Sequence, residues 1–147
     1  MQAECGILSE TKLSSIEMRD FTKKLDDYDG IFVDSRGHSG GLAMRWKKSL
    51  QVTLLSCSST HVDVSIQWTP NDPQWRFTGI YGSPETQNKM KTCALLLDLK
   101  THSALPWLIG GDLNEILYNT EKQGGPSKPQ TILESFQATL ATCDLYD

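Results

Sequence analysis

The sequence lacks the features of membrane and secreted proteins. Its 147 residues contain no apolar run long enough to span a bilayer, and the first ten residues lack the basic and apolar regions of a signal peptide. The four cysteines form no C-x-x-C pair, which argues against a zinc site and, without a secretion signal, favours reduced, buried thiols. We therefore expect an intracellular protein with no membrane partner and no small-molecule cofactor.

The sequence also lacks an excess of basic residues. Lys and Arg number 14 against 18 Asp and Glu, so the formal net charge is −4. Proteins that hold nucleic acid mainly through phosphate contacts usually present a basic face, so the composition argues against tight nonspecific nucleic-acid binding. A phosphodiesterase is still compatible with it, because metal sites need carboxylates.

Alternating apolar and polar residues dominate the middle of the chain and predict half-buried strands. Three helices are expected around them, and two of these begin at capping boxes, Ser14 with Glu17 and Thr131 with Glu134. The expected strands are 42–46, 51–57, 61–68 and 75–81, and the helices follow Ser14, cover 85–101 and start near Thr131. Length and pattern together predict one α/β domain with a largely antiparallel sheet.

The most informative segment is 106–116, where a short apolar run meets two glycines and is followed by Asp112 and Asn114. We expect a buried strand here, with the carboxylate and the amide projecting to the same side just past its end. Such oxygen donors suit Mg²⁺, or the orientation of a water or phosphate oxygen. The alternative is an Asx-rich turn that only closes the strand.

Two further strand ends carry candidate site residues. An apolar segment ends at Glu10, just before the first helix, and another delivers Tyr81 into a Gly-Ser-Pro turn. Taken singly, Glu10 could be a solvated loop acid and Tyr81 an aromatic at the rim of the core. Taken together, three strand ends present Glu, Tyr and Asp-x-Asn in that order along the chain.

This order of motifs resembles the endonuclease/exonuclease/phosphatase superfamily, and most closely the endonuclease domain of plant LINE-type (non-LTR) retrotransposons. The matching segments are 8–12 (LSETK), 37–43 (GHSGGLA) with Trp46, 78–82 (TGIYG) with 84–85 (PE), 106–117 (PWLIGGDLNEIL), and 121–122 (EK) with 124–125 (GG). The Gly-Gly-Leu-Ala and Gly-Gly-Asp-Leu-Asn-Glu-Ile motifs resemble those of the retrotransposon branch. Phosphatase or sphingomyelinase specificity stays open on chemical grounds alone.

The resemblance implies a four-layer α/β/β/α sandwich of mixed, mostly antiparallel sheets and a site for Mg²⁺, with Mn²⁺ as an alternative. Glu10 would bind the metal and Tyr81 would lie near the scissile phosphate. Asp112 would position or deprotonate the attacking water, and Asn114 would hold a phosphate oxygen. DNA would be the ancestral substrate, and the family analogy suggests the nucleus.

The sequence also departs from the family pattern. The family has an Asn on a strand ahead of the glutamate motif and a terminal Ser-Asp-His type motif, and neither is found here. His61 and His102 are expected at the surface and cannot replace the missing histidine. We therefore expect a partial domain over 1–147, truncated at both ends and missing the first and the C-terminal strands.

The predicted function is a Mg-dependent phosphodiester hydrolase, a DNA endonuclease of retrotransposon origin with weak or no activity. Loss of an acid–base group would lower the rate by roughly 10²–10⁴-fold. The alternatives are a catalytically inactive relic and a non-enzymatic interaction module. The sequence leaves the oligomeric state open.

Overall fold

The computed structural model describes residues 5–9, 11, 14–24, 26–34 and 41–146. It divides into two compact units, which are described separately below. The first unit comprises Met1–Tyr81 with Leu105–Asp112, and the second comprises Gly82–Ala104 with Leu113–Asp147.

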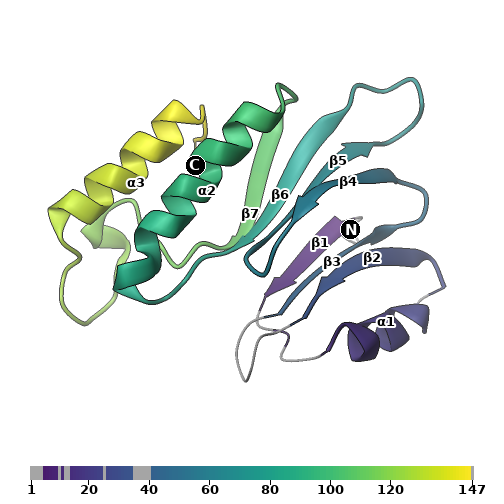
Figure 1. Cartoon of the computed structure of the whole chain (residues 1–147), viewed down its shortest axis with the longest axis horizontal. Coiled ribbons are helices and arrows are strands. Elements are labelled where there is room, and N and C mark those ends of the chain that lie inside the picture. Colours follow the sequence, from purple (N-terminus) through teal and green to yellow (C-terminus); the bar gives the residue numbers. More distant parts are fainter. Residues whose placement is uncertain (1–4, 10, 12–13, 25, 35–40, 147) are drawn as a thin grey trace. The chain divides into compact units, whose positions relative to one another are not determined.

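The first unit contains two sheets (Figure 1). One has three antiparallel strands in the order β1-β3-β2, and the other has four strands in the order β4-β5-β6-β7. In the second sheet β4, β5 and β6 are antiparallel neighbours, while β6 and β7 are parallel. The strands are β1 (Cys5–Ser9), β2 (Tyr28–Val33), β3 (Leu42–Lys47), β4 (Gln51–Cys57), β5 (His61–Gln67), β6 (Trp75–Tyr81) and β7 (Trp107–Asp112).

The two sheets bury a common apolar core. Alternate residues of β3 and β5 point into it, as their alternation in the sequence predicts. Its buried members are Leu42, Met44, Trp46, Leu50, Val62, Val64 and Ile66. The α/β class with mixed, mostly antiparallel sheets is therefore confirmed. The strand β2 was not predicted from the sequence.

The first helix, α1 (Ser15–Lys23), begins at the predicted capping box and packs beside β2 (Figure 1). The Glu17 N–H donates to Ser14 Oγ at 3.2 Å, and the Ser14 N–H donates to Glu17 Oε2 at 2.8 Å. The Ser14 hydroxyl also donates to Glu17 Oε2, and the bonds from the Ser14 backbone and hydroxyl hold the pKa of Glu17 below its ordinary value. Met18 supplies the buried contact of this helix.

A buried polar network crosses β5, β6 and β7. Arg76 donates from Nε and Nη2 to the two carboxylate oxygens of Asp63, at 2.9 and 2.8 Å. Thr78 Oγ1 donates to the same carboxylate at 2.6 Å and accepts from Trp107 Nε1 at 2.8 Å. The Arg76 guanidinium also lies 4.6 Å from the Trp107 ring centroid. The ion pair is completely buried, so each charge depends on the other for compensation.

Gly111 allows β7 to pair closely with β6. The strand runs through both glycines to Asp112, although the sequence predicted that it would stop before them. Gly111 has a φ of 111°, and a Cβ at this position would lie 2.2 Å from the Ile80 carbonyl oxygen. Only glycine fits this conformation and this approach.

The second unit contains two helices that lie side by side, α2 (Lys89–His102) and α3 (Gln130–Thr142), with short 3₁₀ turns η1 (Thr86–Asn88) and η2 (Asn119–Glu121). Their C-terminal ends meet where Lys100 bonds the Cys143 carbonyl at 3.1 Å and Asp144 at 2.7 Å. Helix α3 starts at Gln130 with Pro129 as its N-cap, so the predicted capping box at Thr131 is wrong.

Each of these two helices buries only some of its apolar residues. In α2 the residues Met90 and Leu97 are exposed, and Leu96 and Leu99 are buried instead. In α3 the buried positions are Leu133, Phe136 and Thr139, whereas Ile132 and Leu140 are half-buried. Periodicity alone finds a helix, but it does not decide which of two overlapping apolar faces is covered.

All four cysteines lie in the described part of the chain and are free, with Cys93 and Cys143 buried and Cys57 exposed. Burial raises the pKa of the Cys5 thiol to about 11, so this group is a neutral thiol at physiological pH. Within the described residues no helix has the length and apolarity needed to cross a membrane.

Replacing one member of the buried ion pair should destabilise the first unit. In the Asp63→Asn variant Arg76 keeps a buried charge without its counter-charge, and we expect a loss of about 3–5 kcal/mol in the free energy of unfolding. The matched control, Asp144→Asn, removes the exposed partner of Lys100 and should change it by less than about 1 kcal/mol. Urea unfolding measures both values, and equal midpoints would contradict the role given to Asp63.

A second substitution tests the glycine in β7. Gly111→Ala forces a Cβ against the Ile80 carbonyl at positive φ, so we expect a destabilisation of roughly 1–3 kcal/mol. Gly6→Ala is its control, because a Cβ there meets nothing within 4 Å and should be neutral or slightly stabilising. Thermal unfolding of both variants gives the comparison, and an unchanged Gly111→Ala protein would refute the close approach.

Candidate active site

Two of the predicted site residues, Tyr81 and Asp112, lie side by side at the ends of neighbouring strands. β6 ends at Tyr81, β7 ends at Asp112, and the parallel register pairs these two residues directly. Registered neighbours in a sheet point to the same face. The fold therefore places a phenol and a carboxylate, far apart in the sequence, at one position on one face of the sheet.

Tyr81 is held by both its ring and its backbone. The half-buried ring packs against the core between the two sheets, and the N–H donates to the Thr60 carbonyl oxygen at 2.9 Å. The ring is thus an aromatic at the rim of the core, as the alternative interpretation proposed. That packing also orients the phenol, so the two interpretations are compatible.

Asp112 is the exposed last residue of β7 and directly follows Gly111. Gly111 has a positive φ, but β7 continues through it to Asp112, which keeps its register with Tyr81.

Asn114 belongs to the second unit and is not part of a strand. Its φ of 52° is left-handed, so the extended chain predicted through Asn114 is wrong. Its side-chain Nδ2 donates to the Gly82 carbonyl oxygen at 2.6 Å. A Cβ on Gly82 would lie 1.9 Å from the Leu113 carbonyl oxygen, so glycine is needed for this approach. The amide is therefore anchored to the turn that follows Tyr81 in the sequence.

A buried carboxylate next to Asn114 was missed by the sequence analysis. The Glu115 side chain is only 2% exposed and lies between two lysines. Lys128 Nζ donates to Glu115 Oε2 at 2.9 Å, and Lys89 Nζ lies 3.0 Å from Glu115 Oε1. Both ammonium groups also donate to the Asn114 carbonyl oxygen. The three side chains are distant in the sequence, and no local pattern links them.

The predicted metal ligand, Glu10, lies outside the described residues. Among the described residues no three His, Cys, Asp or Glu side chains form a group that could hold a metal ion. The donors at the paired strand ends are one carboxylate and one phenol. Mg²⁺ commonly takes one or two carboxylates together with water and substrate phosphate, so this donor set suits it when a further carboxylate is available.

His61 is buried, so the expectation of a surface position is wrong. It is 6% exposed, and its ring nitrogens contact Ser56 Oγ at 2.9 Å and Ser58 Oγ at 2.7 Å. The register pairs His61 with Ile80, one residue before Tyr81, so the imidazole is on the opposite face from the phenol. His102, at the end of α2, is exposed as expected.

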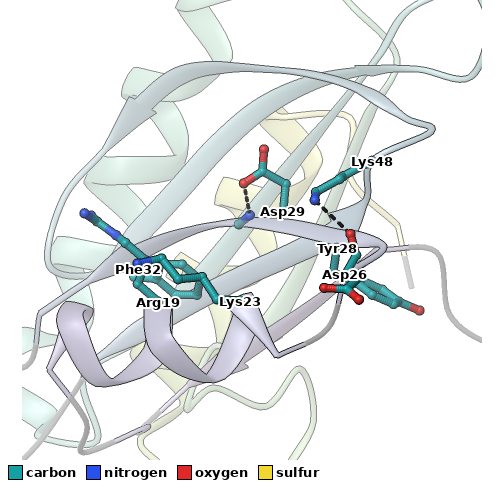
Figure 2. Close-up of a pocket in the computed structure, with 8 residues that line it drawn as sticks. Arg19, Lys23, Asp26, Tyr28, Asp29, Phe32 and Lys48 are labelled. Atoms are coloured by element: carbon teal, nitrogen blue, oxygen red, sulfur yellow. Dashed lines mark hydrogen bonds between the residues drawn. The ribbon is translucent and has the colours of Figure 1, made fainter.

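A separate cavity of about 310 Å³ lies between α1 and β2 in the first unit. Figure 2 shows Lys48 bonded to the Asp26 carbonyl oxygen at 2.8 Å, and the Asp29 carboxylate bonded to the Gly30 N–H at 2.8 Å. Lys23 in turn lies 3.7 Å from Asp20. Acidic and basic groups thus nearly balance here, so this cavity has little net charge to attract an ionic ligand. Its lining residues are Arg19, Lys23, Asp26, Tyr28, Asp29, Gly30, Phe32 and Lys48.

No protein-family model matches the chain, and no curated protein sequence matches it. Solved structures do match. An AP endonuclease, LMAP, from Leishmania major is 14% identical with a TM-score of 0.68, over 95% of this chain and 57% of that one. The 3′ phosphatase NExo from Neisseria, solved with a product DNA hairpin, is 11% identical with a TM-score of 0.64, over 95% and 60%.

The endonuclease domain of TRAS1, a telomere-specific non-LTR retrotransposon, is 13% identical with a TM-score of 0.60, over 90% of this chain and 66% of that one. The chain thus spans between 57% and 66% of the length of these three structures. At these identities the likeness concerns the fold. The chain therefore has the fold of the endonuclease/exonuclease/phosphatase superfamily, as the sequence motifs predicted.

Proposed function

We propose that this chain is a Mg²⁺-dependent phosphodiester hydrolase that nicks DNA, an endonuclease of the retrotransposon type. The pairing of Tyr81 with Asp112 at the ends of parallel strands is the observation that carries the proposal. The fold supports it, because its solved examples include an AP endonuclease and a phosphatase in complex with DNA. The fold together with the order of the motifs favours a phosphodiesterase over a non-enzymatic binding module.

In this proposal Asp112 orients the attacking water and accepts its proton. The exposed carboxylate at the end of β7 suits that role, since a general base must reach solvent and substrate. Tyr81, fixed by its packing, donates a hydrogen bond to a non-bridging oxygen of the scissile phosphate. That bond strengthens as negative charge develops on the phosphate oxygens.

Asn114 and Glu10 complete the proposed set. The Asn114 side-chain amide is anchored by its bond to the Gly82 carbonyl, and two lysines bond the Asn114 backbone carbonyl, so the amide would hold a phosphate oxygen with little reorganisation. Glu10 would bind the divalent cation, with Mn²⁺ as a substitute for Mg²⁺. When bound, such a cation neutralises charge on the reacting phosphate.

The turnover of this chain should be slow. His61 lies on the face opposite Tyr81, and its ring nitrogens already contact two serine hydroxyls. It therefore does not protonate the leaving oxygen. The second candidate, a relic with this fold and no turnover, is favoured by the same observation and predicts no metal-dependent nicking at all.

Nicking of supercoiled plasmid in Mg²⁺ tests the proposal. Asp112→Asn should lower the nicking rate by about 10²–10⁴-fold, because it removes the base while keeping the shape of the side chain. Tyr81→Phe removes one hydrogen bond to the transition state and should lower the rate roughly tenfold. Glu10→Gln should raise the Mg²⁺ concentration that is needed for half-maximal nicking, because it removes the charge of the proposed metal ligand.

The matched control is Asp98→Asn, which removes an exposed carboxylate from α2 and should leave the rate unchanged. Addition of EDTA should stop nicking by the unaltered protein. Nicking that survives both EDTA and Asp112→Asn would refute the proposal. Absence of nicking in Mg²⁺ and in Mn²⁺, with folding intact, would establish the relic instead.

A further inference from the structure

The second unit contains a cavity of about 450 Å³ whose charged lining residues are all lysines. Its volume is in the range of pockets that hold small ligands. Of the described residues that line it, none is acidic. They are Pro84, Thr86, Lys89, Asn114, Lys122, Pro126, Ser127, Lys128 and Pro129.

The charges around this cavity favour an anion. Lys89 and Lys128 share the buried Glu115 carboxylate, which compensates only one of their two positive charges. Lys122 donates to the Pro126 carbonyl oxygen, a neutral acceptor. Three ammonium groups thus face one carboxylate, and the excess of two positive charges is concentrated at a partly enclosed site.

Two helix N-termini add to this potential. Lys89 is the first residue of α2, and Pro129 is the N-cap of α3, so both helices begin at the cavity. Neither helix has an acidic residue in its first turn, and neither N-cap side chain caps its helix with a hydrogen bond. The positive ends of both helix dipoles therefore reinforce the three lysines. Thr86 and Ser127 supply hydroxyl donors of the kind that bind phosphate oxygens.

We propose that this cavity binds a backbone phosphate of the DNA strand. This inference rests on the proposed function and names the part of the chain that holds the substrate. The lysine cavity also resolves the conflict between a net charge of −4 and a polyanionic substrate, since the positive charge is local.

The test measures binding of a fluorescein-labelled DNA duplex by anisotropy, without divalent metal, over a series of salt concentrations. Lys122→Gln is the principal variant, because Lys122 is exposed and its partner among the described residues is a carbonyl oxygen. Each lost lysine–phosphate contact should reduce the slope of log affinity against log salt by about one and weaken binding about five- to tenfold near 0.1 M salt. Lys122→Gln with Lys128→Gln should weaken binding further, but because the cavity holds one phosphate, the slope should fall by no more than about one in total.

Lys91→Gln is the matched control, because Lys91 is an exposed lysine of α2 that does not line the cavity. It removes the same charge and should leave the slope nearly unchanged. Equal thermal midpoints for the variants and the unaltered protein show that folding is intact. If Lys122→Gln and Lys91→Gln bind DNA with the same affinity and slope, the inference is overturned, while plasmid nicking still reports on the proposed function.

Inorganic phosphate separates DNA from a free anion. Stabilisation of the unaltered protein by phosphate, lost in Lys122→Gln, together with unchanged DNA binding would assign the cavity to a small phosphate and overturn the proposal. Phosphate that competes with DNA in the unaltered protein, and less in Lys122→Gln, supports it. DNA binding that depends on Lys122 in a protein without nicking activity would support this inference and reject the proposed activity.

Discussion

The parallel pairing of β6 with β7 is the constraint on which the candidate site depends. Parallel neighbours cannot be joined by a tight turn, so the chain must leave the sheet after Tyr81 and return before Trp107. The intervening segment contains α2, whose first residue is a lysine of the cavity in the second unit. One pairing thus aligns Tyr81 with Asp112 and requires the segment that supplies Lys89.

The energetics of this pairing are unusual, because a charged network lies at its centre. Asp63 of β5, Arg76 and Thr78 of β6, and Trp107 of β7 are linked by hydrogen bonds across three strands. An apolar set at these positions could be equally stable, but it would tolerate a shift in register more easily. The network is satisfied in one register, and that register places Tyr81 beside Asp112.

The strands were largely predictable and the helices only in part. β4 and β6 have the predicted bounds, because in a half-buried strand successive side chains point alternately to the core and to solvent, and the residue types alternate accordingly. β2 was not predicted, and Gly30 lies inside this strand, where the Phe32 ring and the Met44 carbonyl approach it. In α2, Lys89 is buried because Glu115 compensates its charge, a reason that no local pattern contains.

The sequence by itself determined most of the elements, the order of the Glu, Tyr and Asp-x-Asn motifs, and the glycines that the backbone requires next to them. These are local properties, because they depend on the spacing and the type of residues that are near one another in the sequence. The tertiary structure decided which distant residues meet: Tyr81 with Asp112, Glu115 with two lysines, and His61 with two serines on the opposite face. These contacts depend on strand register and on the compensation of buried charge, which arise only when distant segments pack together.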